Sequence, residues 1–347
     1  MLAAASVALA ALLARRTQWP ELALLCGLLV PLAAVVLLHA WHLEYQPAAD
    51  FGWLAWVLLF AVHFRTLWRL APQLPAGALS AAHVLGCWLL LGVLAFELRY
   101  QLLALSEHYN AWRWLGWALL PSAYLWLMAL PRQWPWPVLG YPREYRVLAA
   151  LPLALLMLGW FWLANAASAG EAEPLAYLPL LNPLELGLLF ALAAVFAWLR
   201  VGLVQMGVTA GRSQWLAQVV AGVSLFALLT AMVMRTAHHW GAVPYRLDAL
   251  LDSMLVQAGL SIVWTLIALP LMVVGHLRGR RQLWLVGAAL VALVVAKLFF
   301  VELGNRGGLE RIVSFIGVGV LLLVVGYFAP LPPRKPEGEE PMEQERA

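Results

Sequence analysis

Ten long apolar stretches constrain what this chain can fold into. A transmembrane helix needs about 20 mainly apolar residues to cross the hydrocarbon. The expected spans are 22–40, 51–68, 78–98, 114–131, 145–165, 184–203, 215–234, 253–275, 282–301 and 310–329. A shorter run, 2–14, comes first; because its arginines follow the apolar residues, it is counted as a marginal first helix and not as a signal peptide. The sequence therefore predicts an all-α polytopic transmembrane bundle with ten or eleven spans.

The low charge content agrees with a membrane location. Only 12% of the residues are charged, about half the fraction of a soluble domain. The net charge of +4 comes from arginines at the segment ends and does not indicate nucleic-acid binding. Cys26 and Cys87 lie inside apolar stretches, so we expect two buried side chains and no disulfide. No cofactor and no metal site are expected.

The basic residues occupy alternate loops. Twelve of them follow the first, third, fifth, seventh and ninth expected helices: Arg15, Arg16, Arg65, Arg69, Arg132, Arg143, Arg146, Arg200, Arg212, Arg278, Arg280 and Arg281. The other loops hold only six, and the C-terminal tail adds three. Since basic loops stay in the cytoplasm, the pattern predicts a membrane protein with its N-terminus outside and its C-terminus inside.

The domain organisation is expected to be simple. We expect residues 1–329 to form a single transmembrane helical domain, in which Pro31, Pro121 and Pro152 kink their helices. The segment 330–347 is rich in proline and glutamate, without apolar periodicity, and is predicted to be a disordered cytoplasmic tail.

The segment 235–252, RTAHHWGAVPYRLDALLD, is the densest polar stretch of the predicted outer face. Its candidate catalytic residues are His238, His239, Asp248 and Asp252, because imidazole suits proton transfer near neutral pH. Neighbouring histidines on a helix diverge by about 100°, so the pair does not chelate one ion without a break. The alternative is a polar loop bonded to its neighbours, with the two aspartates complementing a helix dipole.

Basic residues beside this segment are candidates for substrate binding. Arg235 and His239 share a helix face at i,i+4, and arginine suits phosphate or carboxylate groups. Lys297 either extends to the interface or is a buried cation paired with Glu302, Asp248 or Asp252. The substrate-binding candidates are Arg235, Lys297, Glu302 and Arg306. A polar stripe of Ser253, Gln257, Ser261 and Trp264 either faces the bundle interior or lines a route from the outer face.

From about residue 182 to 333 the chain resembles a known family. The segments LNPLELGLLFAL, RTAHHWGAVPYRLDALLDS, WLVGAALVALVVAKLFFVELG and GLERIVSFIGVGVLLLVVGYFAPLPP are similar to the C-terminal part of a bacterial family of predicted multi-pass membrane proteins. That family is defined as a domain of unknown function (family 2339). Its members are usually longer and often carry aspartate at the position of Glu302. The resemblance implies a membrane protein and no particular reaction.

Three functions remain open from the sequence. The first is an enzyme or binding protein that acts on an envelope lipid or lipid-linked substrate at the outer face. The second is a non-catalytic membrane subunit or scaffold with a membrane-protein partner, which requires nothing beyond the helices. The third is a transporter, although the expected midplane carries few polar residues besides Gln257 and Ser261. Membrane lipids are expected partners in each case, and nucleic acid in none.

Overall fold

The computed structural model describes residues 2–39, 45–104 and 111–298, together with 316, 319, 320, 323, 326 and 327. All its regular elements are helices, and the described residues contain no strand. The predicted all-α fold is therefore confirmed. The chain divides into two compact units, Met1–Ala231 and Met232–Ala347, with the boundary inside helix α9 (Ala210–Gly241). Whether residues 1–329 act as one domain stays a prediction, and the predicted tail lies outside the described residues.

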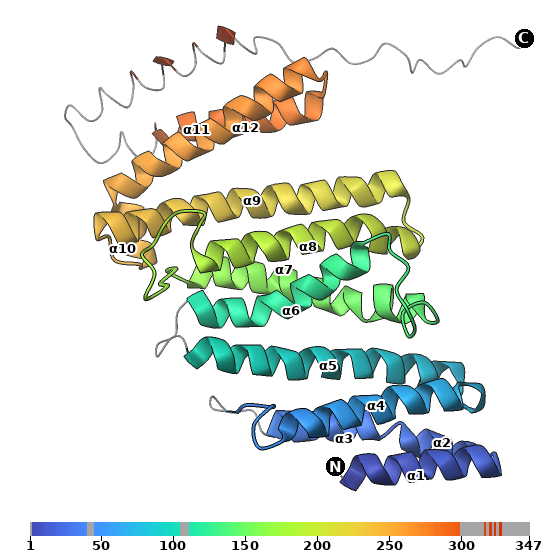
Figure 1. Cartoon of the computed structure of the whole chain (residues 1–347). Coiled ribbons are helices and arrows are strands. Elements are labelled where there is room, and N and C mark those ends of the chain that lie inside the picture. The colour runs from blue at the N-terminus through green and yellow to red at the C-terminus, as the bar shows by residue number, and fades with distance from the viewer. Residues whose placement is uncertain are drawn as a thin grey trace, which may run out of the picture. The chain divides into compact units, whose positions relative to one another are not determined.

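The N-terminal unit is a series of antiparallel helices (Figure 1). Its elements are α1 (Leu2–Thr17), α2 (Pro20–Cys26), α3 (Leu29–His39), α4 (Gly52–Leu70), the short 3-10 turn Ala71–Gln73, α5 (Ala76–Ala104), α6 (Ala111–Ala129), the π-helical turn Glu144–Leu148, α7 (Ala150–Ala167), α8 (Pro183–Gln205) and the first part of α9. Helix α5 packs against α3 and α4 and also against α6.

Two irregular turns in this unit lie one turn before a proline. The expected span 22–40 is two helices separated at Gly27 and Leu28, four residues before Pro31. The π-helical turn ends at Leu148, four residues before Pro152. A proline has no N–H for the carbonyl four residues earlier and its ring clashes with that carbonyl. The structure therefore has an irregular turn before Pro31 and another before Pro152, whereas Pro121 lies within a single helix, α6; the predicted kinks themselves stay predictions.

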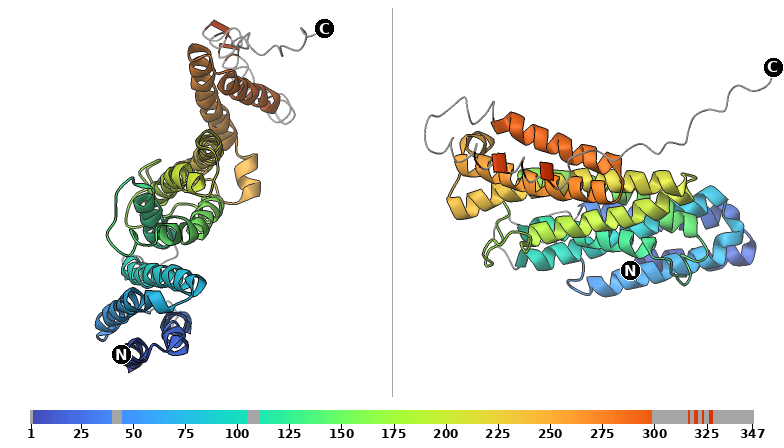
Figure 2. Two further views of the ribbon diagram at one scale, coloured as in Figure 1. Left: turned by 90° about the vertical axis from the view of Figure 1, so that its right-hand side faces the viewer. Right: turned by 90° about the horizontal axis from the view of Figure 1, so that it is seen from above.

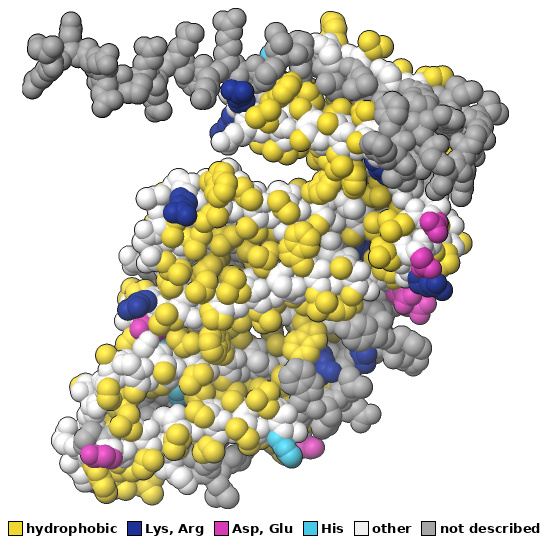
Figure 3. All heavy atoms as spheres, turned by 180° about the vertical axis from the view of Figure 1, so that it is seen from behind, with side chains coloured by type: hydrophobic (Ala, Val, Ile, Leu, Met, Phe, Trp, Pro, Cys, Tyr) yellow, Lys and Arg dark blue, Asp and Glu magenta, His cyan; other side chains and the backbone are white. Residues whose placement is uncertain are grey.

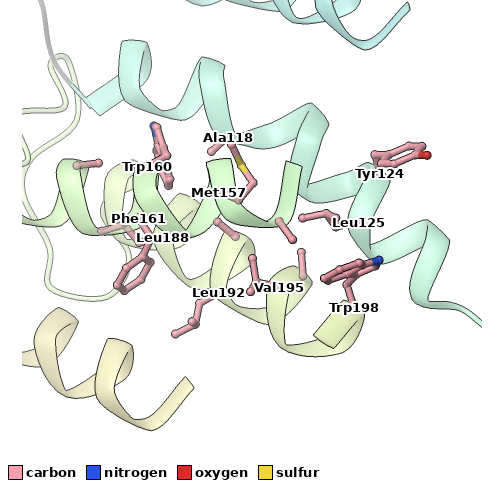
Figure 4. Close-up of a cluster of buried hydrophobic side chains, with 14 of the residues drawn as sticks. Ala118, Tyr124, Leu125, Met157, Trp160, Phe161, Leu188, Leu192, Val195 and Trp198 are labelled. Carbon is pink, nitrogen blue, oxygen red and sulfur yellow. The ribbon is translucent and has the colours of Figure 1, made fainter. Parts of the chain in front are cut away.

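Helices α6, α7 and α8 share a hydrophobic core within the N-terminal unit. They contact one another pairwise, and Figure 2 shows them side by side. Their shared core includes the fully buried side chains of Leu125, Met157, Leu188 and Trp198 (Figure 4). The indole Nε1 of Trp198 donates to the backbone oxygen of Arg146 at 2.8 Å, so even this large side chain has its polar atom satisfied.

The C-terminal unit contains the end of α9, a short helix α10 (Leu247–Asp252), α11 (Met254–Leu277) and α12 (Arg281–Lys297). Helices α11 and α12 form a closely packed hairpin. The end of α9 packs through Val233 and Ala237 against Leu250, Val256 and Leu260. This arrangement brings the end of α9, the start of α11 and the end of α12 into one unit.

Seven helical segments of the described chain are long and apolar enough to cross a membrane: Glu21–His39, Gly52–Gln73, Ala76–Leu102, Glu144–Ala167, Pro183–Gln205, Ala210–Gly241 and Met254–Leu277. Their surfaces between the helix ends are mainly hydrophobic, and charged side chains gather towards the ends (Figure 3). The expected spans 2–14, 114–131 and 282–301 overlap α1, α6 and α12, and residues 299–301 lie outside the described residues. The total of ten or eleven spans stays a prediction, because 310–329 is only sparsely described.

Candidate functional site in the C-terminal unit

Glycines let α11 and α12 approach closely. A Cβ atom on Gly275 would come 2.5 Å from the backbone nitrogen of Trp284 and 2.9 Å from its Cα. A Cβ on Gly287 would come 2.6 Å from Cγ of Met272. The two helices therefore contact each other almost backbone to backbone at these positions. Their antiparallel register then places Lys297, the last residue of α12, beside the second turn of α11.

Lys297 is bonded to the predicted polar stripe. Its Nζ donates to the backbone oxygen of Gln257 at 2.6 Å and to Oγ of Ser261 at 2.7 Å. The Ser261 hydroxyl lies 3.1 Å from the same Gln257 oxygen. Ser253 begins α11 as its N-cap, accepting from the Val256 N–H. The stripe thus faces α12 along part of its length, as expected for polar residues in a bundle interior.

His238 is hydrogen-bonded to the turn that follows α9. Its Nδ1 lies 2.7 Å from the backbone oxygen of Val243. Because a carbonyl oxygen only accepts, Nδ1 is the donor in this hydrogen bond. Ala242 reverses the chain after α9 with a φ of 53°, which brings that carbonyl back over the helix end. The ring of His238 also lies 4.8 Å from the ring of His239 and 5.5 Å from that of Tyr245.

Arg235 lies on a different side of α9 from the contact with α11. Val233 and Ala237 make that contact, and Arg235 is two residues from each, or about 200° around the helix. Its side chain is fully buried. His239 follows at i,i+4 on the same side as Arg235, as the spacing predicts. Arg235 and Lys297 are therefore not brought together through the interface between α9 and α11.

Asp248 and Asp252 are exposed residues of α10. Asp248 pairs with Arg246 at 2.6 Å, and this hydrogen bond from the guanidinium lowers the pKa of the carboxyl. Exposed pairs of this kind contribute little to stability. Within the described part of the chain, neither aspartate forms an ion pair with Lys297. Glu302 and Arg306 lie outside the described residues, so their predicted roles stay predictions.

Two buried histidines of the N-terminal unit were not identified from the sequence, because only residues of the predicted outer loops were considered as candidates. His83 on α5 is fully buried, with its Nδ1 3.0 Å from the hydroxyl of Tyr145 and its ring 4.0 Å from that of Tyr141. His63 on α4 is buried against α5 where Gly86 has no side chain. The sequence did contain a signal for these contacts, namely a glycine and two tyrosines in the segments that the histidines contact. These contacts pack neighbouring helical elements together and do not indicate a bound ligand.

Glu185 is another buried polar residue, although in the sequence it looks like an ordinary acidic residue of a loop. It is the third residue of α8 and is fully buried. Its carboxylate accepts from the hydroxyl of Tyr177 at 2.7 Å and from the backbone N–H of Leu180. Asn182 caps the same helix by accepting from the Leu184 N–H, and its side-chain amide donates to the oxygen of Gly170. The hydrogen bonds of Glu185 and Asn182 thus hold the loop that precedes α8 against the first turn of that helix.

No group of three or more His, Cys, Asp or Glu residues suitable for a metal ion is present in the described ranges. Helices α11 and α12 pack mainly through apolar side chains, but Lys297 makes polar contacts with Gln257 and Ser261 between them. We define Lys297, Gln257 and Ser261 as the lysine site. His238 and His239 lie at the end of α9, in the same unit.

Comparison with known proteins supports the membrane assignment. A family model described as "Predicted membrane protein (DUF2339)" matches residues 1–332. The resemblance predicted from 182–333 is confirmed, and the match begins at the first residue and ends at residue 332. No curated protein and no solved structure matches the chain.

Proposed function

We propose that this chain, which belongs to the DUF2339 family of predicted membrane proteins, binds a lipid or lipid-linked envelope substrate at the lysine site. The proposal places the chain in a bacterial inner membrane with this site towards the outer leaflet. That placement rests on the alternation of arginine loops, which predicts that the α9–α11 connection and the end of α12 face outward.

One observation carries the proposal. Lys297 places its ammonium group against the second turn of α11, within a helix pair that is otherwise mainly apolar. A charged side chain is costly inside a membrane helix, and such residues usually mark substrate or ion sites. An ammonium group is a compact charge that binds phosphate. An anionic lipid headgroup carries the opposite charge and reaches the site from the bilayer.

The test is lipid retention measured by native mass spectrometry of the detergent-extracted protein. We expect the wild-type chain to keep a phosphate-bearing lipid when anionic and zwitterionic phospholipids are offered together. Lys297→Met should lose that lipid by at least tenfold, because it removes the charge and keeps most of the side-chain volume. Arg281→Met is the matched control, since Arg281 is exposed at the opposite end of α12. Equal lipid retention by all three proteins would overturn the proposal.

The predicted orientation is tested by cysteine labelling in intact cells. Leu247→Cys is a suitable outer position because Leu247 is 69% exposed. Leu277→Cys, at the other end of α11, is the matched inner position and is 77% exposed. We expect a membrane-impermeant maleimide to label the first in intact cells and the second only after permeabilisation. The native Cys26 and Cys87 are buried and should contribute little background. The reverse pattern would contradict the orientation.

A further inference from the structure

Three arginines occupy the turn between α11 and α12. Arg278, Arg280 and Arg281 are all exposed. Gly279 has a φ of 62°, and the N–H of Arg280 donates to the backbone oxygen of Gly275 at 2.8 Å, so the turn is tight and its backbone is bonded. In the part of the chain that the structure describes, none of the three guanidinium groups forms an ion pair. We define Arg278, Arg280 and Arg281 as the arginine turn.

The helix hairpin itself supplies no carboxylate for these arginines. The sequence has no Asp or Glu from 253 to 301. Asp248 and Asp252 precede α11, which has 24 residues and is therefore roughly 36 Å long, so they lie at the other end of the hairpin. Glu302 and Glu310 follow the end of α12 and are expected at that other end too. An anionic partner for the arginine turn must therefore come from elsewhere.

The C-terminal tail is an acidic segment of the same unit. It carries five glutamates with no basic residue among them, namely Glu337, Glu339, Glu340, Glu343 and Glu345. The family match ends at residue 332, so these glutamates lie outside it. The expected span 310–329 crosses the bilayer in the direction opposite to α12, and its residues Gly326 and Tyr327 are helical. The tail is therefore expected to begin on the same side of the membrane as the arginine turn.

The tail is long enough to reach the arginine turn. Glu337 follows Tyr327 by ten residues, and an extended chain of that length spans up to about 35 Å. Neighbouring helices pack only about 8–10 Å apart. A short tether gives such a segment an effective concentration on the order of millimolar. An exposed ion pair shifts an equilibrium by roughly 1.4- to 5-fold, so three pairs together favour the contact by about tenfold.

We infer that the glutamates of the tail bind the arginine turn and cover it. A guanidinium group donates two parallel hydrogen bonds to a carboxylate, and neighbouring arginines of a tight turn can pair with neighbouring glutamates such as Glu339 and Glu340. The bound tail neutralises this end of the hairpin and keeps it from anionic lipid headgroups. Because the contact consists of exposed ion pairs, salt weakens it. The inference is independent of the lysine site, which lies at the opposite end of α12.

Disulfide formation in the full chain tests this contact. Gln282→Cys places a thiol at an exposed position in the first turn of α12, and Gly338→Cys places another between two tail glutamates. We expect mild oxidation to join them within one chain. The rate should fall about tenfold when salt is raised from about 0.1 M to about 1 M, because the Debye length shortens from about 10 Å to about 3 Å. Leu247→Cys, exposed before α11, is the matched control for position 282 and should form no disulfide with Gly338→Cys.

Charge removal on either side of the contact gives a second measurement. Replacing the five tail glutamates by glutamine should slow the disulfide by about tenfold. Arg280→Gln combined with Arg281→Gln should also slow it, because two of the three guanidinium groups are then lost. Thermal unfolding establishes that each variant is folded. An unchanged rate in a folded variant with the glutamine tail, or equal rates at low and high salt, would show collision without binding and overturn the inference.

Reconstitution in lipid nanodiscs distinguishes the tail from other occupants of the arginine turn. We expect the same disulfide rate in phosphatidylcholine alone and in a mixture with phosphatidylglycerol. Loss of the disulfide in the mixture alone would assign the turn to anionic headgroups and overturn the inference. A disulfide that joins two chains instead of closing within one would assign the tail to a second copy of the protein, which would also overturn it.

Discussion

Gly275→Ala is expected to push α11 and α12 apart and to lower the free energy of unfolding by about 1–3 kcal/mol, the usual cost of overpacking. The added methyl would meet the backbone nitrogen and Cα of Trp284 at 2.5 and 2.9 Å. Backbone atoms within a helix do not move aside as a flexible side chain does, so the whole helix has to shift. The shift would also draw Lys297 away from Ser261.

Thermal unfolding in detergent and lipid retention together measure this effect. Gly222→Ala is the matched control, because Gly222 is also helical and a Cβ there has open space. That substitution should be neutral or stabilise the helix by up to about 1 kcal/mol. A Gly275→Ala protein with the thermal stability and lipid content of the Gly222→Ala protein would contradict the close helix contact.

Glu185→Leu is expected to release the loop that precedes α8 and to destabilise the N-terminal unit. The substitution leaves the hydroxyl of Tyr177 and the N–H of Leu180 without their carboxylate acceptor. The Tyr177 hydroxyl is buried, and a buried donor that loses its acceptor costs about 1–3 kcal/mol. The loop is also tied to α6, where the Ala111 N–H donates to the oxygen of Glu171 at 2.7 Å. Cooperative loosening of the start of α6 should follow.

Limited proteolysis and thermal unfolding report this change. Glu173→Leu makes the same chemical change in the same loop at an exposed side chain, so it should leave the unfolding temperature nearly unchanged. Faster cleavage between α7 and α8 is expected for Glu185→Leu alone. Equal cleavage of the two variants would show that the buried carboxylate does not hold the loop.

The helices were predictable because their signal is local. Each expected span in the well-described ranges coincides with one helix or, for 22–40, with two, since an apolar run of this length has few alternatives in a bilayer. The separation of α2 from α3 was only partly predictable. Pro31 predicts an irregularity in this helix. The sequence does not predict that the chain turns at Gly27 and Leu28 instead of bending smoothly.

The contacts of the lysine site were less accessible to sequence reasoning. The polar stripe containing Gln257 and Ser261 was visible from its helical spacing, and Lys297 was recognised as a candidate. Their meeting depends on the register of α11 against α12, which is set by close contacts at Gly275 and Gly287. Tertiary register of this kind has no local sequence signal. The carboxylate partners considered for Lys297 came from proximity in the predicted topology, and those within the described residues do not contact it.

Burial was the other property that the sequence concealed. Glu185 resembles an ordinary acidic residue of an outer loop, yet its carboxylate is enclosed at the start of α8. His63 and His83 occur in separate apolar spans, and only their tertiary contacts, of His63 with α5 and of His83 with Tyr141 and Tyr145, show that both are buried. Asp248, by contrast, lies in the first turn of α10 and pairs with Arg246 on the surface, and its candidate catalytic role stays a prediction.

Site-specific photocross-linking tests the proposed lipid binding at the lysine site most directly. A photoreactive amino acid at position 258, exposed beside Ser261, would capture whatever occupies the approach to Lys297. The captured molecule is then identified by mass spectrometry of the protein from native membranes. The account predicts a phosphate-bearing lipid adduct that disappears in Lys297→Met and persists in Arg281→Met. An adduct of equal yield in both variants, or no lipid adduct in a folded protein, would contradict it.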